Sequence, residues 1–463
     1  MKLYNTLTRQ ADDIVPLHPD KVTVYTCGPT VYDYPHIGNW FTYIREDILI
    51  RVLKVAGLHP DWVMNITDVG HLVSDADEGE DKLEKGARRE GKTAWEVAAH
   101  YTDYFLEGLD RLSIIRPDHV TKATEHIEEQ IALIKTLEDK GFTYVINDGV
   151  YYDTSKFPAY AVFARLDLDE QQAGARVEYN TEKRQPTDFA LWKFSPDDRQ
   201  RDMEWDSPWG KGFPGWHIEC SAMSMKYLGP TIDIHAGGID HVPVHHTNEI
   251  AQSEAATGQR FAQYWMHSNH IMIEGDKISK SLGNGYTLED IEAHDIELQA
   301  FRLHVLESHY RSQSKFSWDS LQAAQNRLRN WRATAVLRWQ PKDMSSVSTQ
   351  LTDEFARHLL NDLNTPLALA KIDEDFAKLQ ASLTDNTAAD GLTGYLQLIK
   401  DSLGIDLLGS TPDITDDQKR LISERDTARA DRDWRHSDEI REALAEQGIA
   451  VRDTAYGTIW ARQ

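Results

Sequence analysis

The chain has 463 residues, 40% of them hydrophobic, and a net charge of −25 from 50 basic and 75 acidic side chains. This length predicts about three domains, and the acidic balance excludes sequence-independent nucleic-acid binding through a broad basic surface, although not one specific RNA held by local basic patches. A mean hydropathy of −0.55 without a long apolar run excludes a membrane-spanning protein. The N-terminus lacks the apolar core of a signal peptide, and only two cysteines occur, which predicts a cytoplasmic location without a disulfide.

The first predicted elements form a strand–helix–strand unit. Residues 21–26 are typical of a buried strand, which Cys27-Gly28-Pro29 ends, a helical pattern follows over about 39–56, and a second strand is predicted at 61–66. Such a unit predicts a parallel sheet, and ligands bind such sheets beyond the carboxyl ends of the strands. Cys27 and His36 both fall there.

The remaining elements predict an α/β fold with a change of character after about residue 315. Residues 70–90 are charge-dense and predicted as a loop, 93–113 and 124–140 as helices, 143–193 as short strands and turns of an insertion, and 200–260 as Gly-rich loops alternating with short apolar runs. We expect a Rossmann-like doubly wound parallel-sheet domain over 1–315 with an insertion at about 115–200. An α-helical bundle is expected over 316–405, and after a linker at 404–415 a small C-terminal region over 419–463, with one helix to about 447 and a strand-like tail.

Two short motifs far apart in the chain have the chemistry of a polyphosphate site. Pro35-His36-Ile37-Gly38-Asn39 places an imidazole and a glycine ahead of a helix, and Lys277-Ile278-Ser279-Lys280-Ser281-Leu282-Gly283-Asn284 offers two lysines and hydroxyls in a loop. No G-x-x-x-x-G-K-[ST] loop occurs in the chain. A Lys-x-x-Lys loop alone is usually solvated surface. Together, however, the motifs resemble the HIGH and KMSKS signatures of class I aminoacyl-tRNA synthetases, which implies ATP activation of a carboxylate.

The two cysteines are candidates for a metal site. Cys27 ends a strand, Cys220 lies in Trp216-His217-Ile218-Glu219-Cys220, and His245 and Glu249 share one face if 245–249 is helical. Two thiolates, an imidazole and a carboxylate suit Zn²⁺. Spacing alone leaves open the alternative of two buried cysteines acting as small hydrophobes and a solvated His/Glu helix face.

A wider set of segments resembles the cysteinyl-tRNA synthetase family across nearly the whole chain. The matching segments are 25–33, 65–68, 188–193, 207–210, 215–223, 233–240 and 248–253, together with a tail over 453–460. The resemblance implies that Cys27, Cys220, His245 and Glu249 hold one zinc ion, which binds the thiol of the substrate. Since an apolar pocket separates cysteine poorly from serine, a thiolate–metal bond would supply the selectivity without editing.

The resemblance also implies roles for further residues. His36, Asn39, Lys277 and Lys280 would be catalytic. ATP, accompanied by Mg²⁺, would contact His36, Gly38, Asn39, Gly237, Gly238, Asp240, Lys277, Ser279 and Lys280. Cysteine would contact Gly28, Thr67 and Trp216, and Trp460 would stack on an unpaired base of the anticodon read by residues 419–463. Arg429 and Arg432 recur along the last predicted helix and are candidate tRNA contacts, with a solvated, salt-bridged helix face as the default alternative.

The implied activity is that of a cytoplasmic, monomeric cysteine–tRNA ligase that uses L-cysteine, ATP and tRNA(Cys). Two alternatives remain open from the sequence: a related ligase that joins cysteine to an aminocyclitol amine in mycothiol synthesis, and a non-catalytic tRNA-binding paralogue. The chain departs from the family pattern at Asn39, where a second histidine is usual, and at Phe213 and Ile459, where arginines are usual. We therefore expect an altered phosphate contact at Asn39 and one anticodon contact fewer.

Overall fold

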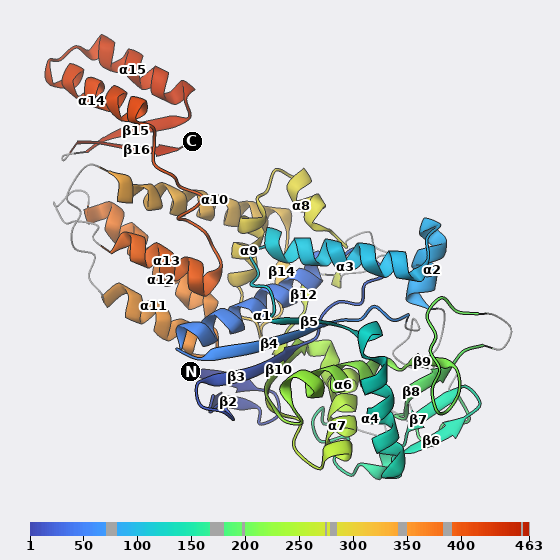
Figure 1. The fold of residues 1–463 in the computed structure, drawn as a ribbon. Coiled ribbons are helices and arrows are strands. Elements are labelled where there is room, and N and C mark those ends of the chain that lie inside the picture. The colour runs from blue at the N-terminus through green and yellow to red at the C-terminus, as the bar shows by residue number, and fades with distance from the viewer. Residues whose placement is uncertain are drawn as a thin grey trace. The chain divides into compact units, whose positions relative to one another are not determined.

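The protein was analysed as a computed structural model that describes residues 1–70, 81–166, 180–196, 200–273, 276–277, 285–340, 350–382, 391–454 and 457–462 (Figure 1). The chain divides into two compact units. The first comprises Met1–Asp290 and Tyr310–Lys315, and the second comprises Ile291–His309 and Phe316–Gln463. None of the helices in the described ranges combines the length and the apolar character that crossing a bilayer requires.

A five-stranded sheet forms the centre of the first unit, in the order β11-β10-β3-β4-β5 with every pair parallel. The strands span β3 (Lys21–Thr26), β4 (His59–Ile66), β5 (His119–Lys122), β10 (Ile232–Gly238) and β11 (Ala262–Ser268). The predicted strands at 21–26 and 61–66 and the parallel Rossmann-like sheet are confirmed. From its second residue to its end, β3 is buried, as expected for a central strand with helices on both faces.

Helices cover both faces of this sheet. The helix α1 (Ile37–Val55) contacts β4 and β10, whereas α6 (Trp216–Leu228) contacts β3 and β4 and lies on the opposite face beside α7 (Thr247–Thr257) (Figure 1). The prediction of Gly-rich loops and short apolar runs over 200–260 missed α6 and α7. Both helices bury polar side chains, such as Glu219 and Ser221 in α6 and Gln252 in α7. Their sequences therefore lack the apolar stripe by which a helix is predicted.

The inserted region is an antiparallel sheet in the order β6-β7-β8-β9, packed on α4 (Ile127–Asp139). Its strands are β6 (Thr143–Ile146), β7 (Gly149–Tyr152), β8 (Phe189–Phe194) and β9 (Gly212–Pro214). The expected short strands are therefore present. The first unit also contains β1 (Lys2–Asn5), β2 (Gln10–Asp13), β12 (Ile271–Ile273) and β13 (Asp276–Lys277), with α8 (Leu288–Ala293) and β14 (Ser314–Phe316) at its boundary.

The prediction of a loop over 70–90 is wrong for its second half, which forms α2 (Lys82–Glu90), packed on α3 (Ala94–Arg111). Asp81 caps α2, because its carboxylate accepts hydrogen bonds from the backbone N–H groups of Leu83 and Glu84. Asp81 also pairs with the buried Arg201. The charge-dense segment 82–90 is thus helical because Asp81 caps its first turn and is itself held by the distant Arg201.

The second unit is mainly helical, as predicted. Its helices are α9 (Leu298–Leu306), α10 (Trp318–Ala335), α11 (Gln350–Leu360), α12 (Thr365–Ser382), α13 (Leu392–Leu403), α14 (Asp416–Ala430) and α15 (Trp434–Glu446), followed by the hairpin of β15 (Ile449–Thr454) and β16 (Gly457–Arg462). The single predicted helix over 416–447 is instead two helices. The chain reverses at Arg432, whose φ is 60°, and Asp433 caps the second helix.

Glu46 on α1 is a buried acid with no exposed surface. Burial raises the pKa of Glu46 well above its ordinary value, and the Thr26 hydroxyl opposes this only in part. An acid whose folded-state pKa is raised stabilises the fold fully below its unfolded pKa, about 4.3, and this contribution is lost as pH rises towards the folded-state pKa.

We therefore expect Glu46→Gln to be more stable than the parent protein at pH 8, with a difference that shrinks towards pH 4.5. Urea unfolding at both pH values measures this difference in the free energy of unfolding. Each pH unit by which folding raises the pKa of Glu46 contributes about 1.4 kcal/mol to it. A stability difference that is the same at both pH values would show that folding does not raise the pKa of Glu46.

Candidate active site and metal centre

A cavity of about 640 Å³ opens at the carboxyl ends of β3, β4 and β10. Cys27 and Gly28 follow β3, and Thr67 follows β4. Gly238 is the last residue of β10, and Asp240 lies two residues beyond it; all five residues line the cavity. This is the position that a parallel sheet offers to ligands, because the strands end there and the helix N-termini point inward.

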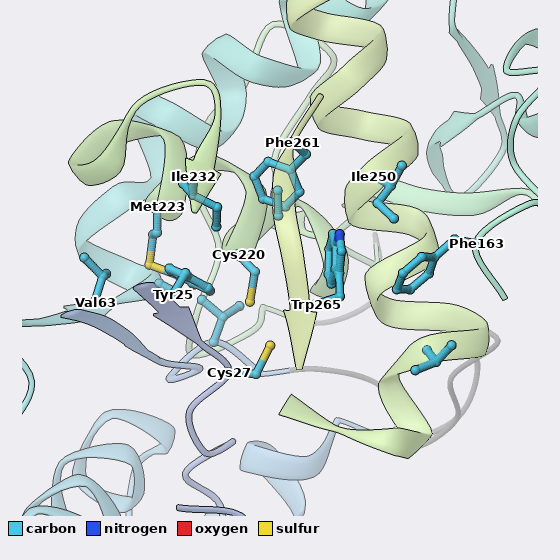
Figure 2. Close-up of a cluster of buried hydrophobic side chains, with 14 of the residues drawn as sticks. Tyr25, Cys27, Val63, Phe163, Cys220, Met223, Ile232, Ile250, Phe261 and Trp265 are labelled. Atoms are coloured by element: carbon cyan, nitrogen blue, oxygen red, sulfur yellow. The ribbon is translucent and has the colours of Figure 1, made fainter. Parts of the chain in front are cut away.

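The four predicted metal ligands lie together at the floor of this cavity. One donor atom from each of Cys27, Cys220, His245 and Glu249 lies within 4.8 Å of the others, and all four residues are buried. Figure 2 shows the two sulfur atoms pointing towards each other from the β3 end and from α6. Two thiols, an imidazole and a carboxylate in such a cluster fit a zinc ion by donor chemistry.

Electrostatics around the cluster favour a bound cation. The Cys27 thiol and the nearby His245 lower the pKa of Cys220 to about 6, so one thiolate is available at neutral pH. Burial alone would raise the pKa of Glu249, but His235 and His245 hold it well below its ordinary value. Burial would lower the pKa of His245, yet Glu249 and Cys220 raise it to about 10, a proton that a metal would replace.

Two further histidines, His235 and His246, contact the predicted ligands, and a third, His267, contacts His246; the sequence analysis predicted none of these contacts. His235 Nε2 lies 2.7 Å from Glu249 Oε2, His246 Nε2 lies 3.4 Å from Cys27 Sγ, and His246 Nδ1 lies 2.8 Å from His267 Nε2. Burial lowers the pKa of His246 and of His267, which keeps both rings neutral. His235 and His246 also form, with Cys27 and Glu249, a second group of donors within 4.8 Å. The only sequence signal was the density of histidine between 235 and 267.

The predicted cysteine-binding residues meet beside the metal ligands. Gly28 and Thr67 are linked through Asn65, because the Gly28 N–H donates to Asn65 Oδ1 at 2.8 Å and Asn65 Nδ2 donates to Thr67 Oγ1 at 3.0 Å. Thr67 Oγ1 in turn donates to Glu219 Oε2 at 3.0 Å.

Trp216 was also predicted to contact cysteine. The centroid of its ring lies 4.4 Å from the centroid of the His245 ring. Trp216 lines the cavity, as do Gly28, Thr67 and Asn65. The hydrogen-bonded series Gly28, Asn65, Thr67 and Glu219 was not predicted, although residues 65–68 were among the segments that resemble the family.

Most of the predicted ATP contacts surround the N-terminus of α1 and the end of β10. His36, Gly38, Asn39, Gly238 and Asp240 line the cavity. Gly237 lies one residue deeper, where a Cβ would come within 2.8 Å of His241 Nδ1. Only the backbone of Lys277 is described, paired with Met272 between β13 and β12, and Ser279 and Lys280 lie outside the described residues.

Asn39 has a structural role that the sequence did not indicate. It closes a capping box at the start of α1, in which His36 N–H donates to Asn39 Oδ1 at 3.0 Å and Asn39 N–H donates to His36 Nδ1 at 3.3 Å. Because Nδ1 is an acceptor here, the neutral His36 ring carries its proton on Nε2, from which it can donate to a phosphate.

We expect Asn39→Asp to keep the cap, with a free energy of unfolding within about 0.5 kcal/mol, because the carboxylate still accepts from His36 N–H. The added negative charge facing a polyphosphate should nevertheless raise the KM for ATP by about tenfold or more in ATP–pyrophosphate exchange. Asn39→His, which restores a ring donor, should change the same KM. If neither substitution altered exchange, Asn39 would have no part in phosphate binding.

The predicted tRNA contacts divide. Trp460 is only 4% exposed and packs with Val336, Ile440 and Leu444 in the core of the second unit, so its predicted stacking on an unpaired base is not supported. Successive side chains of a strand point to opposite faces, so the sequence does not show whether a tryptophan in a strand faces the core or the surface; the tertiary fold decides this.

Arg429 pairs with Asp453 at 3.2 Å and lies 5.5 Å from the ring of Trp434, which is 56% exposed. Arg432 is exposed in the turn between α14 and α15. Trp434, which the sequence analysis overlooked, is therefore an exposed aromatic side chain among the described residues of this region.

Comparisons with known proteins identify the family of the chain. A family model described as the class I (C) tRNA synthetase catalytic domain matches residues 13–326, and one for the cysteinyl-tRNA ligase anticodon binding domain matches residues 411–460. The chain is 42% identical to a cysteine–tRNA ligase of Treponema denticola (100% of this chain, 99% of that protein). It is 46% identical to a cysteine–tRNA ligase 1 of Burkholderia lata (99% and 96%).

Among solved structures, a methionyl-tRNA synthetase of Mycobacterium tuberculosis bound to methionyl-adenylate has a TM-score of 0.58 at 13% identity, covering 83% of this chain and 92% of that one. This likeness concerns the fold. Because the family models match both the catalytic and the C-terminal regions and the relatives match over the full length, the chain belongs to the cysteinyl-tRNA ligase family of class I tRNA synthetases.

Proposed function

We propose that the protein is a cysteine–tRNA ligase that activates L-cysteine with ATP and transfers it to the 3′ end of tRNA(Cys). The observation that carries this proposal is the buried cluster of Cys27, Cys220, His245 and Glu249 at the floor of a cavity whose rim is the N-terminus of α1. A cluster of these donors suits a metal that binds a thiol, and a helix N-terminus beside it suits phosphates, which supports the proposal.

In the first step a carboxylate oxygen of cysteine attacks the α-phosphorus of ATP, and the bond to pyrophosphate breaks. His36 and Asn39 would orient the phosphates at the start of α1, and Lys277 and Lys280 would neutralise the developing charge. In the second step a ribose hydroxyl of the tRNA attacks the acyl carbon, loses its proton and displaces AMP. ATP would enter with Mg²⁺.

The four buried donors would hold a zinc ion, which when bound supplies a Lewis acid that favours the thiolate form of the substrate. Trp216 would cover the bound side chain, and the Gly28–Asn65–Thr67 chain would position its amino acid moiety. Glu249 is proposed as the weakest of the four ligands. His235 Nε2 lies 2.7 Å from Glu249 Oε2, so one carboxylate oxygen keeps a partner if the other leaves the metal.

We expect Glu249→Gln to lose zinc less completely than Cys220→Ser, because an amide oxygen still donates weakly to a metal whereas a lost thiolate is not replaced. Metal analysis of the purified variants, together with zinc titration, measures this. Equal loss in both variants would mean that Glu249 is a full ligand.

The proposed activity is tested by ATP–pyrophosphate exchange and by charging. We expect exchange that depends on cysteine, at least about 100-fold weaker exchange with serine, and charging of tRNA(Cys) but not of an aminocyclitol amine. The match of residues 411–460 to an anticodon-binding domain disfavours the aminocyclitol ligase. Absence of exchange would favour the non-catalytic paralogue, and equal exchange with cysteine and serine would remove the role of the metal.

The C-terminal region would contact the tRNA through Arg429, Arg432 and the exposed ring of Trp434, since single-stranded RNA is commonly bound by stacking on aromatic rings. We further propose that the protein acts as a cytoplasmic monomer, on the strength of the family resemblance. Sedimentation at micromolar concentration tests the oligomeric state.

A further inference from the structure

Tyr34 is an aromatic side chain at the rim of the cavity that the proposed chemistry leaves unused. It belongs to the loop between β3 and α1, it lines the cavity, and 43% of it is exposed. Most of the cavity floor is buried; Thr67, for example, is 1% exposed. Tyr34 thus lies where a molecule enters from solvent.

The Tyr34 ring is held in place by α3. It makes edge-to-face contacts with His100, Tyr101 and Tyr104, with ring centroids 6.1, 5.0 and 4.7 Å away. The Tyr34 hydroxyl also lies 3.4 Å from His100 Nε2. A ring fixed before binding loses little conformational entropy when a ligand stacks on it.

The charges beside Tyr34 are paired. The neighbouring Asp33 lies 3.4 Å from Arg89, which also contacts Glu90 at 3.1 Å, and Glu289 lies 2.7 Å from Arg111. Because these described charges are paired with opposite ones, this part of the rim suits a neutral planar group better than a phosphate chain.

We propose that Tyr34 is the surface on which the 3′-terminal adenine of the tRNA stacks while cysteine is transferred. This inference rests on the proposed function and deepens it. The terminal ribose must reach the activated carboxyl group inside the cavity, so its base comes to lie within the cavity or at its rim. The predicted ATP contacts Gly238 and Asp240 lie at the end of β10 and just beyond it, whereas Tyr34 packs on α3.

The test compares Tyr34→Leu with Tyr34→Trp in the full chain. Tyr34→Leu should raise the KM for tRNA in aminoacylation by about 5- to 150-fold, the usual range for one lost base–aromatic stack, whereas Tyr34→Trp should stay near the parent value. The KM for ATP in cysteine-dependent exchange without tRNA should change by less than about twofold in either variant. Tyr227→Leu, which removes another partly exposed tyrosine that does not line the cavity, is the matched control.

A second measurement isolates the base. The affinity of tRNA lacking its terminal adenosine should be equal for the parent protein and Tyr34→Leu, whereas the affinity of the intact tRNA should fall in the variant. An unchanged KM for tRNA, an equal loss with the truncated tRNA, or a parallel rise in the KM for ATP would overturn the inference. If the parent protein catalysed neither exchange nor charging, the proposed function itself would fail. Thermal melting establishes that the variants fold, and Tyr34→Trp keeps the test valid if Tyr34→Leu does not.

Discussion

Cys220→Ser is expected to abolish zinc binding at neutral pH and to reduce cysteine-dependent ATP–pyrophosphate exchange by about 1000-fold. Cys220 is 1% exposed, and its thiol is the one whose pKa is lowered, to about 6, by the hydrogen bond from Cys27 and by His245. A serine hydroxyl in the same place stays protonated and is a harder, weaker ligand. Losing a supporting contact to a ligand costs about 10- to 100-fold in metal affinity, so losing the ligand itself should cost more.

Metal analysis and exchange kinetics measure this outcome, with excess zinc added in a second series. Met225→Leu, a volume-conserving change of a partly buried residue on the same helix, should leave zinc content and exchange near the parent values. A Cys220→Ser protein with full zinc and normal selectivity against serine would show that Cys220 is not a zinc ligand.

Gly28→Ala is expected to destabilise the first unit by about 2–4 kcal/mol and to raise the KM for cysteine sharply. A Cβ at residue 28 would lie 1.8 Å from the carbonyl oxygen of Asn65 and 3.0 Å from Met64 Cγ. Because the obstacle is backbone of the neighbouring strand, a change of side-chain rotamer cannot relieve it, and overpacking of this kind costs about 1–3 kcal/mol or more. Separation of the strand ends would also break the Gly28–Asn65 hydrogen bond of 2.8 Å and displace Cys27.

Urea unfolding and cysteine-dependent exchange measure the two effects. Gly394→Ala on α13 provides the matched control, since no atom lies within 4 Å of its added Cβ. That substitution should be neutral or stabilise the helix by up to about 1 kcal/mol. A Gly28→Ala protein as stable and as active as the control would mean that the ends of β3 and β4 can separate without consequence.

Local sequence patterns were sufficient to predict the first strand–helix–strand unit and one pair of candidate metal ligands. The apolar run at 21–26, the turn at Cys27 and the helical pattern from 39 were sufficient to predict the β3–α1–β4 unit and the edge at which its ligands bind. The i, i+4 spacing of His245 and Glu249 predicted that both lie on one face of a helical segment, and His245 Nε2 lies 2.8 Å from Glu249 Oε1. Such features depend on residues a few positions apart, which is why a sequence alone reveals them.

Only the tertiary structure decided how distant residues combine. The contact of His246 with Cys27 spans 219 positions, and that of Thr67 with Glu219 spans 152, so no local pattern announces either. Trp460 entered a core, while Trp434 remained exposed and available to a ligand. Burial and long-range hydrogen bonding depend on which elements meet, and this is set by the free energy of the whole fold rather than by neighbouring residues.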